Sequence, residues 1–149
     1  MPILRFFSCF GLICGIASAM RALKPDAKVY ACEVETAAPV AASFAAGEPS
    51  DVQYTATFVD GMGAPFVFPD MWALASQLLE GSLVTTLEEI ASAIRLLVER
   101  NHVVAEGAGA APVAAALSGK AGGGKVVCVV SGGNIDSDKL ATILRGGIP

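Results

Sequence analysis

The residues best placed for chemistry follow the last apolar run of the chain. Residues 126–130 are all apolar and lead directly into Ser131, two glycines and an asparagine. Such a run is typical of a strand covered on both faces in a parallel sheet. Ser131 can donate or accept a hydrogen bond, and Gly132 lets backbone approach a ligand closely. Because open α/β sheets bind ligands where their strands end, this turn is the predicted ligand site.

Other candidate catalytic side chains are few. The single histidine, His102, follows an expected helix end, which favours a surface or capping role over that of a base. The five lysines, which all lie near expected element ends, are Lys24, Lys28, Lys120, Lys125 and Lys139. The four cysteines lack a C-x-x-C pair, so neither a zinc site nor a disulfide framework is indicated. They are predicted to be small buried thiols in a reducing cytoplasm.

Alternating strands and helices must position these residues. Helices are predicted over 11–23, 36–46, 69–79, 86–100, 109–117 and 136–144, and strands over 28–33, 83–84, 103–106 and 126–130. The alternation predicts an α/β fold, a mostly parallel twisted sheet with helices on both faces. Residues 1–10 fit no element well and are predicted to be an atypical N-terminal segment before one domain over 11–149.

Composition excludes some function classes. The chain has 149 residues, 54% of them hydrophobic, and a net charge of −4 with scattered basic residues, which argues against a nucleic-acid surface. No apolar run is long enough for a confident membrane span. Arg5, the apolar run 6–17 and the small residues at 17–19 imitate a signal peptide. The amphipathic pattern continues past that cleavage point to Lys24, which favours an ordinary helix.

Five motifs in order resemble one family. They are Val104-Ala-Glu-Gly-Ala-Gly-Ala-Ala111, Lys125-Val-Val-Cys-Val-Val-Ser-Gly-Gly-Asn-Ile-Asp136, Val59-Asp-Gly-Met62, Val29-Tyr-Ala-Cys-Glu33 and Gly11-Leu-Ile-Cys-Gly-Ile-Ala17. Together they resemble the C-terminal part of the threonine/serine dehydratases, which with serine racemase belong to the tryptophan-synthase-β type of pyridoxal-phosphate enzymes. The resemblance implies a partial large domain of a fold-type II pyridoxal-phosphate enzyme.

The resemblance also implies roles for individual residues. Ser131 becomes the partner of the pyridine nitrogen, followed by Gly132, and Gly61 lies near the cofactor ring. Glu106 either helps to hold the cofactor's surroundings or caps the following helix. Taken without the other motifs, Ser131 would more simply be a residue that turns the strand.

The phosphate cradle of the family is a loop of four glycines and an apolar residue at a helix N-terminus. Here only Gly11 and Leu12 match, because Ser8, Cys9 and Phe10 stand where the earlier glycines belong. Phe10 would place a ring where the phosphate should lie. This departure counts against phosphate binding.

The family's lysine that forms the Schiff base lies in a Ser-x-Lys-x-Arg-Gly segment that this sequence lacks, so no catalytic residue is assigned. Glu33 matches a carboxylate that binds a divalent cation in some members, but Pro39 replaces its acidic partner. One carboxylate makes a poor Mg²⁺ or Ca²⁺ site, so Glu33 is predicted to be structural and no metal is expected.

The resemblance implies a cytoplasmic, homo-oligomeric parent enzyme that converts L-threonine or L-serine to a 2-oxo acid and ammonia. The chain itself is expected to be an inactive C-terminal fragment, with residues 1–10 arising from a shifted reading frame or a misplaced start. Two alternatives remain at this point. One is a non-catalytic remnant that pairs with a full-length paralogue, and the other is a small secreted protein with a cleaved N-terminus.

Overall fold

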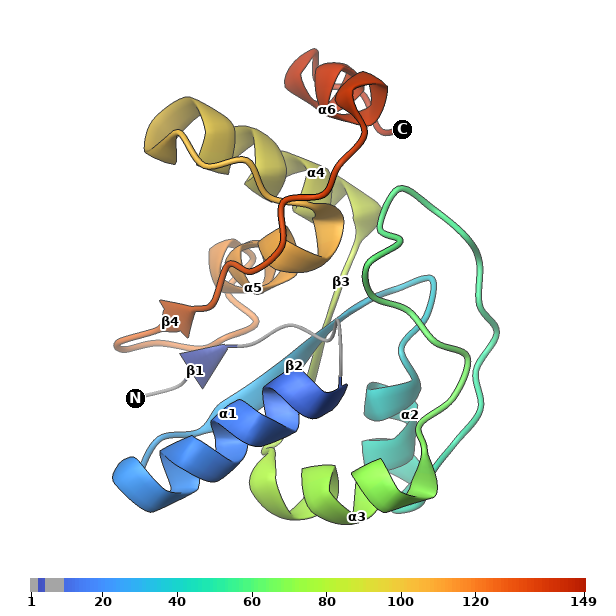
Figure 1. Cartoon of the computed structure of the whole chain (residues 1–149), viewed down its shortest axis with the longest axis vertical. Coiled ribbons are helices and arrows are strands. Elements are labelled where there is room, and N and C mark those ends of the chain that lie inside the picture. Colours follow the sequence, from blue (N-terminus) through green and yellow to red (C-terminus); the bar gives the residue numbers. More distant parts are fainter. Residues whose placement is uncertain (1–2, 5–9) are drawn as a thin grey trace.

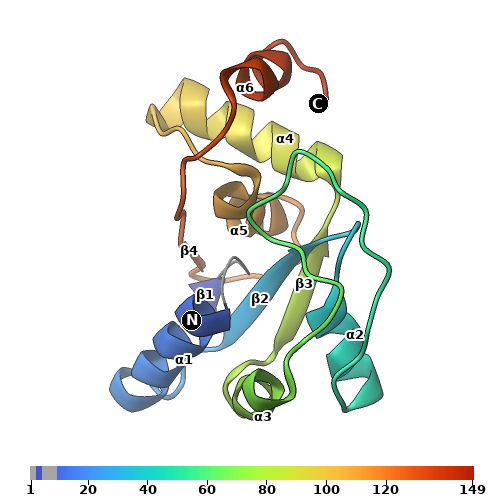
Figure 2. The same cartoon turned by 45° about the vertical axis from the view of Figure 1, so that its right-hand side comes forward.

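The computed structural model describes residues 3–4 and 10–149, in which one parallel sheet lies between two layers of helices (Figures 1 and 2). The strand order is β3-β2-β1-β4, and every neighbouring pair is parallel. The strands are β1 (Ile3–Leu4), β2 (Val29–Val34), β3 (Gly81–Thr85) and β4 (Val127–Cys128). The predicted parallel α/β architecture is confirmed.

Helices cover both faces of the sheet, as predicted. They are α1 (Phe10–Leu23), α2 (Pro39–Ala46), α3 (Pro69–Leu78), α4 (Leu87–Leu96), α5 (Gly107–Leu117) and α6 (Ser137–Leu144), with a π-helical turn, η1 (Leu97–Asn101), continuing α4. The alanine-rich α5 contacts all four strands and is backed by α4. Helices α1, α2 and α3 pack on the opposite face (Figure 1).

The central strand β2 shows how the sequence specifies the two layers. Val29 and Ala31 are buried in the core that includes α1, α2 and α3. Cys32 and Val34 are buried in the larger core that includes α4 and α5. Successive side chains of a strand point to opposite faces, so an unbroken apolar sequence here fills both cores. Burying Val29 and Val34 contributes about 1.5–3 kcal/mol each.

The helix boundaries follow local signals. The helix predicted over 36–46 begins only at Pro39, because proline is well suited to the first helical position. The predicted capping box of α4 is present, with the Thr86 hydroxyl accepting from the Glu89 amide and the Glu89 carboxylate accepting from the Thr86 amide. His102 ends η1 in the left-handed region, with a φ of 57°, in agreement with the predicted capping role.

Three expectations about extended segments are wrong. Residues 126–130 were predicted to form a strand covered on both faces, but β4 pairs only over Val127–Cys128, and Val127 is 40% exposed. Its neighbour β1 is itself two residues long, which limits the pairing. Residues 103–106 form no strand. Residues 1–10 were expected to fit no element, but Ile3–Leu4 is β1, between β2 and β4.

Two further expectations can be compared with the structure. Cys14 and Cys32 are buried, as predicted, whereas Cys128 is only half-buried, and Cys9 lies outside the described residues. Burial raises the pKa of the Cys14 and Cys128 thiols. Among residues 3–4 and 10–149, no helix is both long enough and apolar enough to cross a membrane.

Candidate functional site

The sheet topology marks a place for a ligand between β1 and β4. The chain leaves β1 through α1 toward β2 on one side, whereas β4 pairs on the other side of β1. Ligands of open α/β sheets bind outside the carboxyl ends of the strands at such a reversal. Ser131 follows the carboxyl end of β4, and α1 begins after that of β1. The topology therefore brings the turn at Ser131 and the N-terminus of α1 to one edge of the sheet.

Ser131 has a buried hydroxyl that could bind a ligand. Its Oγ atom is buried, yet it has no hydrogen-bond partner among the described residues. A buried hydroxyl without a partner costs about 1–3 kcal/mol, so most folded proteins avoid one. The backbone of Ser131 packs tightly against α5. The approach is so close that a Cβ atom at Gly109 would collide with the Ser131 carbonyl oxygen. The hydroxyl is thus held in place but left unsatisfied.

Glu106 fastens the turn that carries Ser131. The Glu106 amide donates to the carbonyl oxygen of Gly132 at 3.2 Å, and the Asn134 amide donates to Glu106 Oε2 at 3.1 Å. The same carboxylate lies against Gly132, where an added Cβ would collide with it. A Cβ at Gly61 would lie only 2.8 Å from Glu106 Oε1. Glu106 therefore brings Gly61 and the Ser131 turn together.

This geometry argues against one of the two predicted roles of Glu106, that of a helix cap. The residue occupies the N-cap position of α5, but its side chain makes no capping hydrogen bond. Its carboxylate instead accepts from the backbone of the Ser131 turn. The side chain of Glu106 therefore holds the turn after β4 and does not cap α5.

The structure places the six sequence-predicted site residues in two groups. Ser131, Gly132, Glu106 and Gly61 form the contact network just described. Gly11 and Leu12 lie in the first turn of α1 and are exposed. The backbone amides of a first helical turn attract anions, as the predicted phosphate cradle requires. Ser8 and Cys9, which replace family glycines, lie outside the described residues.

Sequence reasoning missed three contributors to this site. The backbone amide of Asn134, rather than its side chain, binds Glu106. Gly109 provides the space for the Ser131 carbonyl, and its alternation with small residues in α5 was the available signal. Lys139 Nζ lies 3.2 Å from Asp60 Oδ2 and so ties α6 to the loop that carries Gly61. Lys139 and Asp60 are 79 residues apart in the sequence, so no local pattern predicts this pair.

Glu33 has the structural role that the sequence predicted. It is only 2% exposed, and its Oε1 accepts from the Val40 amide at 2.8 Å. Its Oε2 accepts from the Ala41 amide at 2.8 Å and from Ser82 Oγ at 2.6 Å. Burial raises the pKa of the Glu33 carboxyl, although these hydrogen bonds act in the opposite direction.

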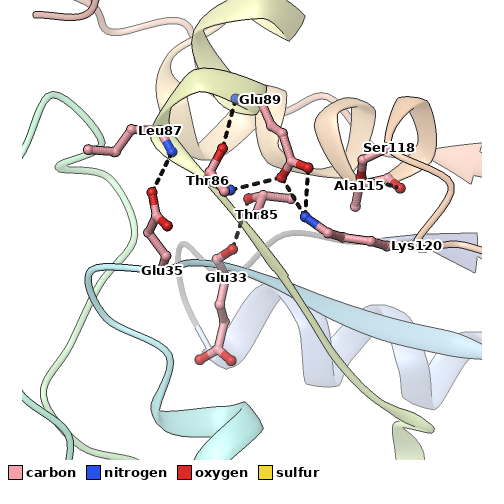
Figure 3. Close-up of polar contacts among 9 residues, drawn as sticks. All are labelled: Glu33, Glu35, Thr85, Thr86, Leu87, Glu89, Ala115, Ser118 and Lys120. Atoms are coloured by element: carbon pink, nitrogen blue, oxygen red, sulfur yellow. Dashed lines mark hydrogen bonds and ion pairs between the residues drawn. The ribbon is translucent and has the colours of Figure 1, made fainter.

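Both oxygens of Glu33 thus hold the N-terminus of α2. Figure 3 shows this carboxylate directed away from the contacts that join Thr86, Glu89 and Lys120. Within residues 3–4 and 10–149, no group of three or more His, Cys, Asp or Glu side chains could hold a metal ion.

The lysines occupy structural or exposed positions. Lys120 Nζ binds both oxygens of Glu89, at 2.7 and 2.5 Å (Figure 3). Lys28 Nζ lies 3.9 Å from Glu80 Oε2. Lys24 and Lys125 are exposed near element ends. Lys139, expected at an element end, lies in the first turn of α6 and binds Asp60 and Asp136, which raise its pKa. All five lysines lie near the end of a helix or strand, as expected.

Comparisons with known proteins agree with this geometry. Residues 8–132 match the model of the pyridoxal-phosphate dependent enzyme family. The chain belongs to this family. The L-threonine ammonia-lyase of Geobacter sulfurreducens is 35% identical over 140 residues, which are 93% of this chain and 35% of that protein. The catabolic L-threonine dehydratase TdcB of Escherichia coli K12 is 35% identical over 89% of this chain and 42% of its own length.

Solved structures of the family have the same fold. The T.th. threonine deaminase matches with a TM-score of 0.84 and 30% identity, over 91% of this chain and 50% of that one. Maize serine racemase matches with a TM-score of 0.84 and 31% identity, over 97% of this chain and 48% of that one. The chain is thus a partial domain of the fold-type II pyridoxal-phosphate enzymes, and it spans about half or less of the relatives it matches.

Proposed function

We propose that this chain supplies the ring-binding side of the pyridoxal-phosphate site of a threonine/serine dehydratase. The parent reaction is the conversion of L-threonine or L-serine to a 2-oxo acid and ammonia. The observation that supports it is the buried Ser131 hydroxyl, without a partner among the described residues, at the carboxyl end of a strand. Such a hydroxyl fits the pyridine nitrogen, which needs one hydrogen-bond partner. When bound, pyridoxal phosphate supplies an electron sink for bond cleavage beside the amino group.

Each site residue then has a defined task. Ser131 Oγ donates to the pyridine nitrogen and, being neutral, leaves it unprotonated, which suits elimination. Glu106 holds the turn of Ser131 and Gly132 through its hydrogen bonds to the backbone. Gly61 leaves room for the Glu106 carboxylate and would lie near the cofactor ring. The first turn of α1, with Gly11, offers amides toward the phosphate.

The chain by itself is proposed to be inactive. The covalent route of these enzymes requires a lysine on the cofactor. All five lysines lie near element ends, and Lys139 is engaged with Asp60 and Asp136. We expect the purified chain to release no ammonia from L-serine or L-threonine, and measurable release would contradict this part of the proposal.

Binding can be tested without a lysine. The probe is 4′-deoxypyridoxine 5′-phosphate, which keeps the ring nitrogen and the phosphate but lacks the aldehyde. We expect calorimetry to detect binding that Ser131→Ala weakens about fivefold, the effect of one neutral hydrogen bond of about 1 kcal/mol. Ser131→Asp should shift the ultraviolet absorption of the bound probe toward its ring-protonated form.

The matched control is Ser118→Ala, at an exposed residue just beyond α5 whose hydroxyl donates to the Ala115 carbonyl. Its affinity for the probe should equal that of the wild type. Equal affinity of Ser131→Ala and wild type, or no binding by the wild type at millimolar probe, would refute the assignment of Ser131.

The proposal extends to the setting of the parent enzyme. We place it in the cytoplasm as a homo-oligomer acting on a free amino acid. The thiols of the buried Cys14 and the half-buried Cys128, whose pKa burial raises, suit a reducing compartment. Fractionation of native cells and light scattering of the parent enzyme would test the two statements separately.

A further inference from the structure

Lys139 contacts two carboxylates that come from distant parts of the sequence. Its Nζ atom lies 3.2 Å from Asp60 Oδ2 and 3.1 Å from Asp136 Oδ2. Asp60 lies in the long loop between α2 and α3 and directly precedes Gly61, whereas Asp136 is the N-cap residue of α6. One ammonium group therefore connects the loop of Gly61 to the start of α6.

The Glu106 carboxylate joins the same two segments at a second point. A Cβ atom at Gly61 would lie only 2.8 Å from Glu106 Oε1, and the Asn134 amide donates to Glu106 Oε2 at 3.1 Å. Asn134 stands two residues before Asp136, in the segment that follows β4. The two segments are thus linked twice, through Glu106 and through Lys139.

The place of Lys139 on α6 is electrostatically unfavourable for a lysine. It is the third residue of the helix, where backbone amides carry partial positive charge and disfavour a cation. Its pair with Asp136 spans three positions of the chain and acts within this helix end. Its pair with Asp60 reaches a different element, so it is the contact that fixes one segment of the site against the other.

Both pairs are partly open to solvent, which separates positioning from stability. The Lys139 side chain is 31% exposed, and those of Asp60 and Asp136 are 61% and 73% exposed. Ion pairs at such exposure contribute little to the free energy of unfolding, and salt screens them. Their effect is therefore expected in the local arrangement of the two segments and not in the overall stability of the chain.

We propose that Lys139 is a positioning residue of the cofactor site: through Asp60 it holds the loop of Gly61 against the segment that follows Ser131. The inference rests on the proposed function, in which Gly61 lies near the cofactor ring and Ser131 donates to its nitrogen. Without the ion pair the loop moves more freely relative to Ser131. The ring-binding side is then formed in a smaller fraction of the molecules, and ligand affinity falls by that fraction.

The first test needs no ligand and measures hydrogen exchange in the full chain. It follows two amides that bind across the site, those of Asn134 and Glu106. Lys139→Met should speed the exchange of both by about threefold, because local opening becomes easier. The matched control is Lys120→Met, which removes the same charge and the pair with Glu89. It should leave both exchange rates unchanged.

The second test measures the affinity of the full chain for 4′-deoxypyridoxine 5′-phosphate by calorimetry. Lys139→Met should weaken binding about threefold, whereas Lys139→Arg and Lys120→Met should bind like the wild type. The difference between Lys139→Met and the wild type should vanish at about 1 M salt.

Asp60→Asn separates positioning from a direct effect of charge on the anionic probe. Removing a carboxylate near an anion would tighten binding by charge alone. Loss of the ion pair with Lys139 should instead weaken binding about threefold, as Lys139→Met does.

Several results would overturn the inference. They are unchanged amide exchange or unchanged probe affinity in Lys139→Met, an equal change in Lys120→Met, and tighter binding by Asp60→Asn. Failure of the wild type to bind the probe would instead refute the assignment of Ser131. The exchange rates would then still decide whether Lys139 holds the two segments together.

Discussion

Two serine hydroxyls contrast the structural and the functional parts of this molecule. Ser82 Oγ, on β3, donates to the Glu33 carboxylate at 2.6 Å. The same carboxylate accepts hydrogen bonds from two backbone amides of α2. Ser131 Oγ, beyond β4, is buried without a partner in the described part of the chain. The donors around Glu33 are already paired with its carboxylate, so they are not available to a ligand. The Ser131 hydroxyl can still donate a hydrogen bond to one. The difference supports a structural role for Ser82 and the proposed ligand-binding role for Ser131.

The largest expected effect comes from breaking the closed network. Glu33→Ala would leave two amides of α2 and the Ser82 hydroxyl without their acceptor. We expect the free energy of unfolding to fall by about 3 kcal/mol, the upper part of the range for unsatisfied buried groups. Urea denaturation followed by circular dichroism measures it. A loss below about 1 kcal/mol would show that water can replace the carboxylate there.

The next effect concerns the space beneath Ser131. Gly109→Ala would press a methyl group into the Ser131 carbonyl, and we expect a loss of about 1–3 kcal/mol in unfolding free energy. The matched control is Gly15→Ala, also in a helix but facing open space. It should gain up to about 1 kcal/mol from helix propensity. Equal effects of the two substitutions in thermal unfolding would disprove the tight packing of α5 under the turn.

A smaller effect is a pH dependence. Because burial raises the pKa of Glu33 above its unfolded value of about 4.3, the folded state binds this proton more tightly. The stabilisation is complete below the unfolded pKa and is lost as pH rises through the folded pKa. The stability of the wild type relative to Glu33→Gln should therefore decline as pH rises from about 4.

Urea titrations of both proteins at several pH values measure this decline. Glu35→Gln, at the neighbouring exposed carboxylate, is the control. A relative stability that rises with pH would mean that the hydrogen bonds to Glu33 outweigh its burial.

The sequence predicted the helices and the central strand better than the contacts around Ser131. The helices, the central strand β2 and the capping box at Thr86 follow from local periodicity and spacing, which a single sequence displays. The strand over 126–130 was overestimated, because its apolar pattern reports how the strand should be covered and not which neighbours are present. At the site, the motifs that resemble the family identify Ser131, Glu106 and Gly61 as candidates. Their contacts depend on chain reversals that no local pattern encodes.

The smallest change sharpens the comparison most, because the two serines should respond with opposite signs. Ser82→Ala removes a donor from the buried Glu33 carboxylate, and we expect about 1 kcal/mol less stability. Ser131→Ala removes a buried hydroxyl that has no partner among the described residues, so the free chain should gain about 1 kcal/mol. With saturating 4′-deoxypyridoxine 5′-phosphate the difference in stability between the two variants should narrow by about 1 kcal/mol, because Ser131→Ala binds the probe about fivefold more weakly than Ser82→Ala. Thermal unfolding of both variants, with and without the probe, measures these changes. If Ser131→Ala destabilised the free chain as Ser82→Ala does, the hydroxyl would already have a partner and would not be reserved for a ligand.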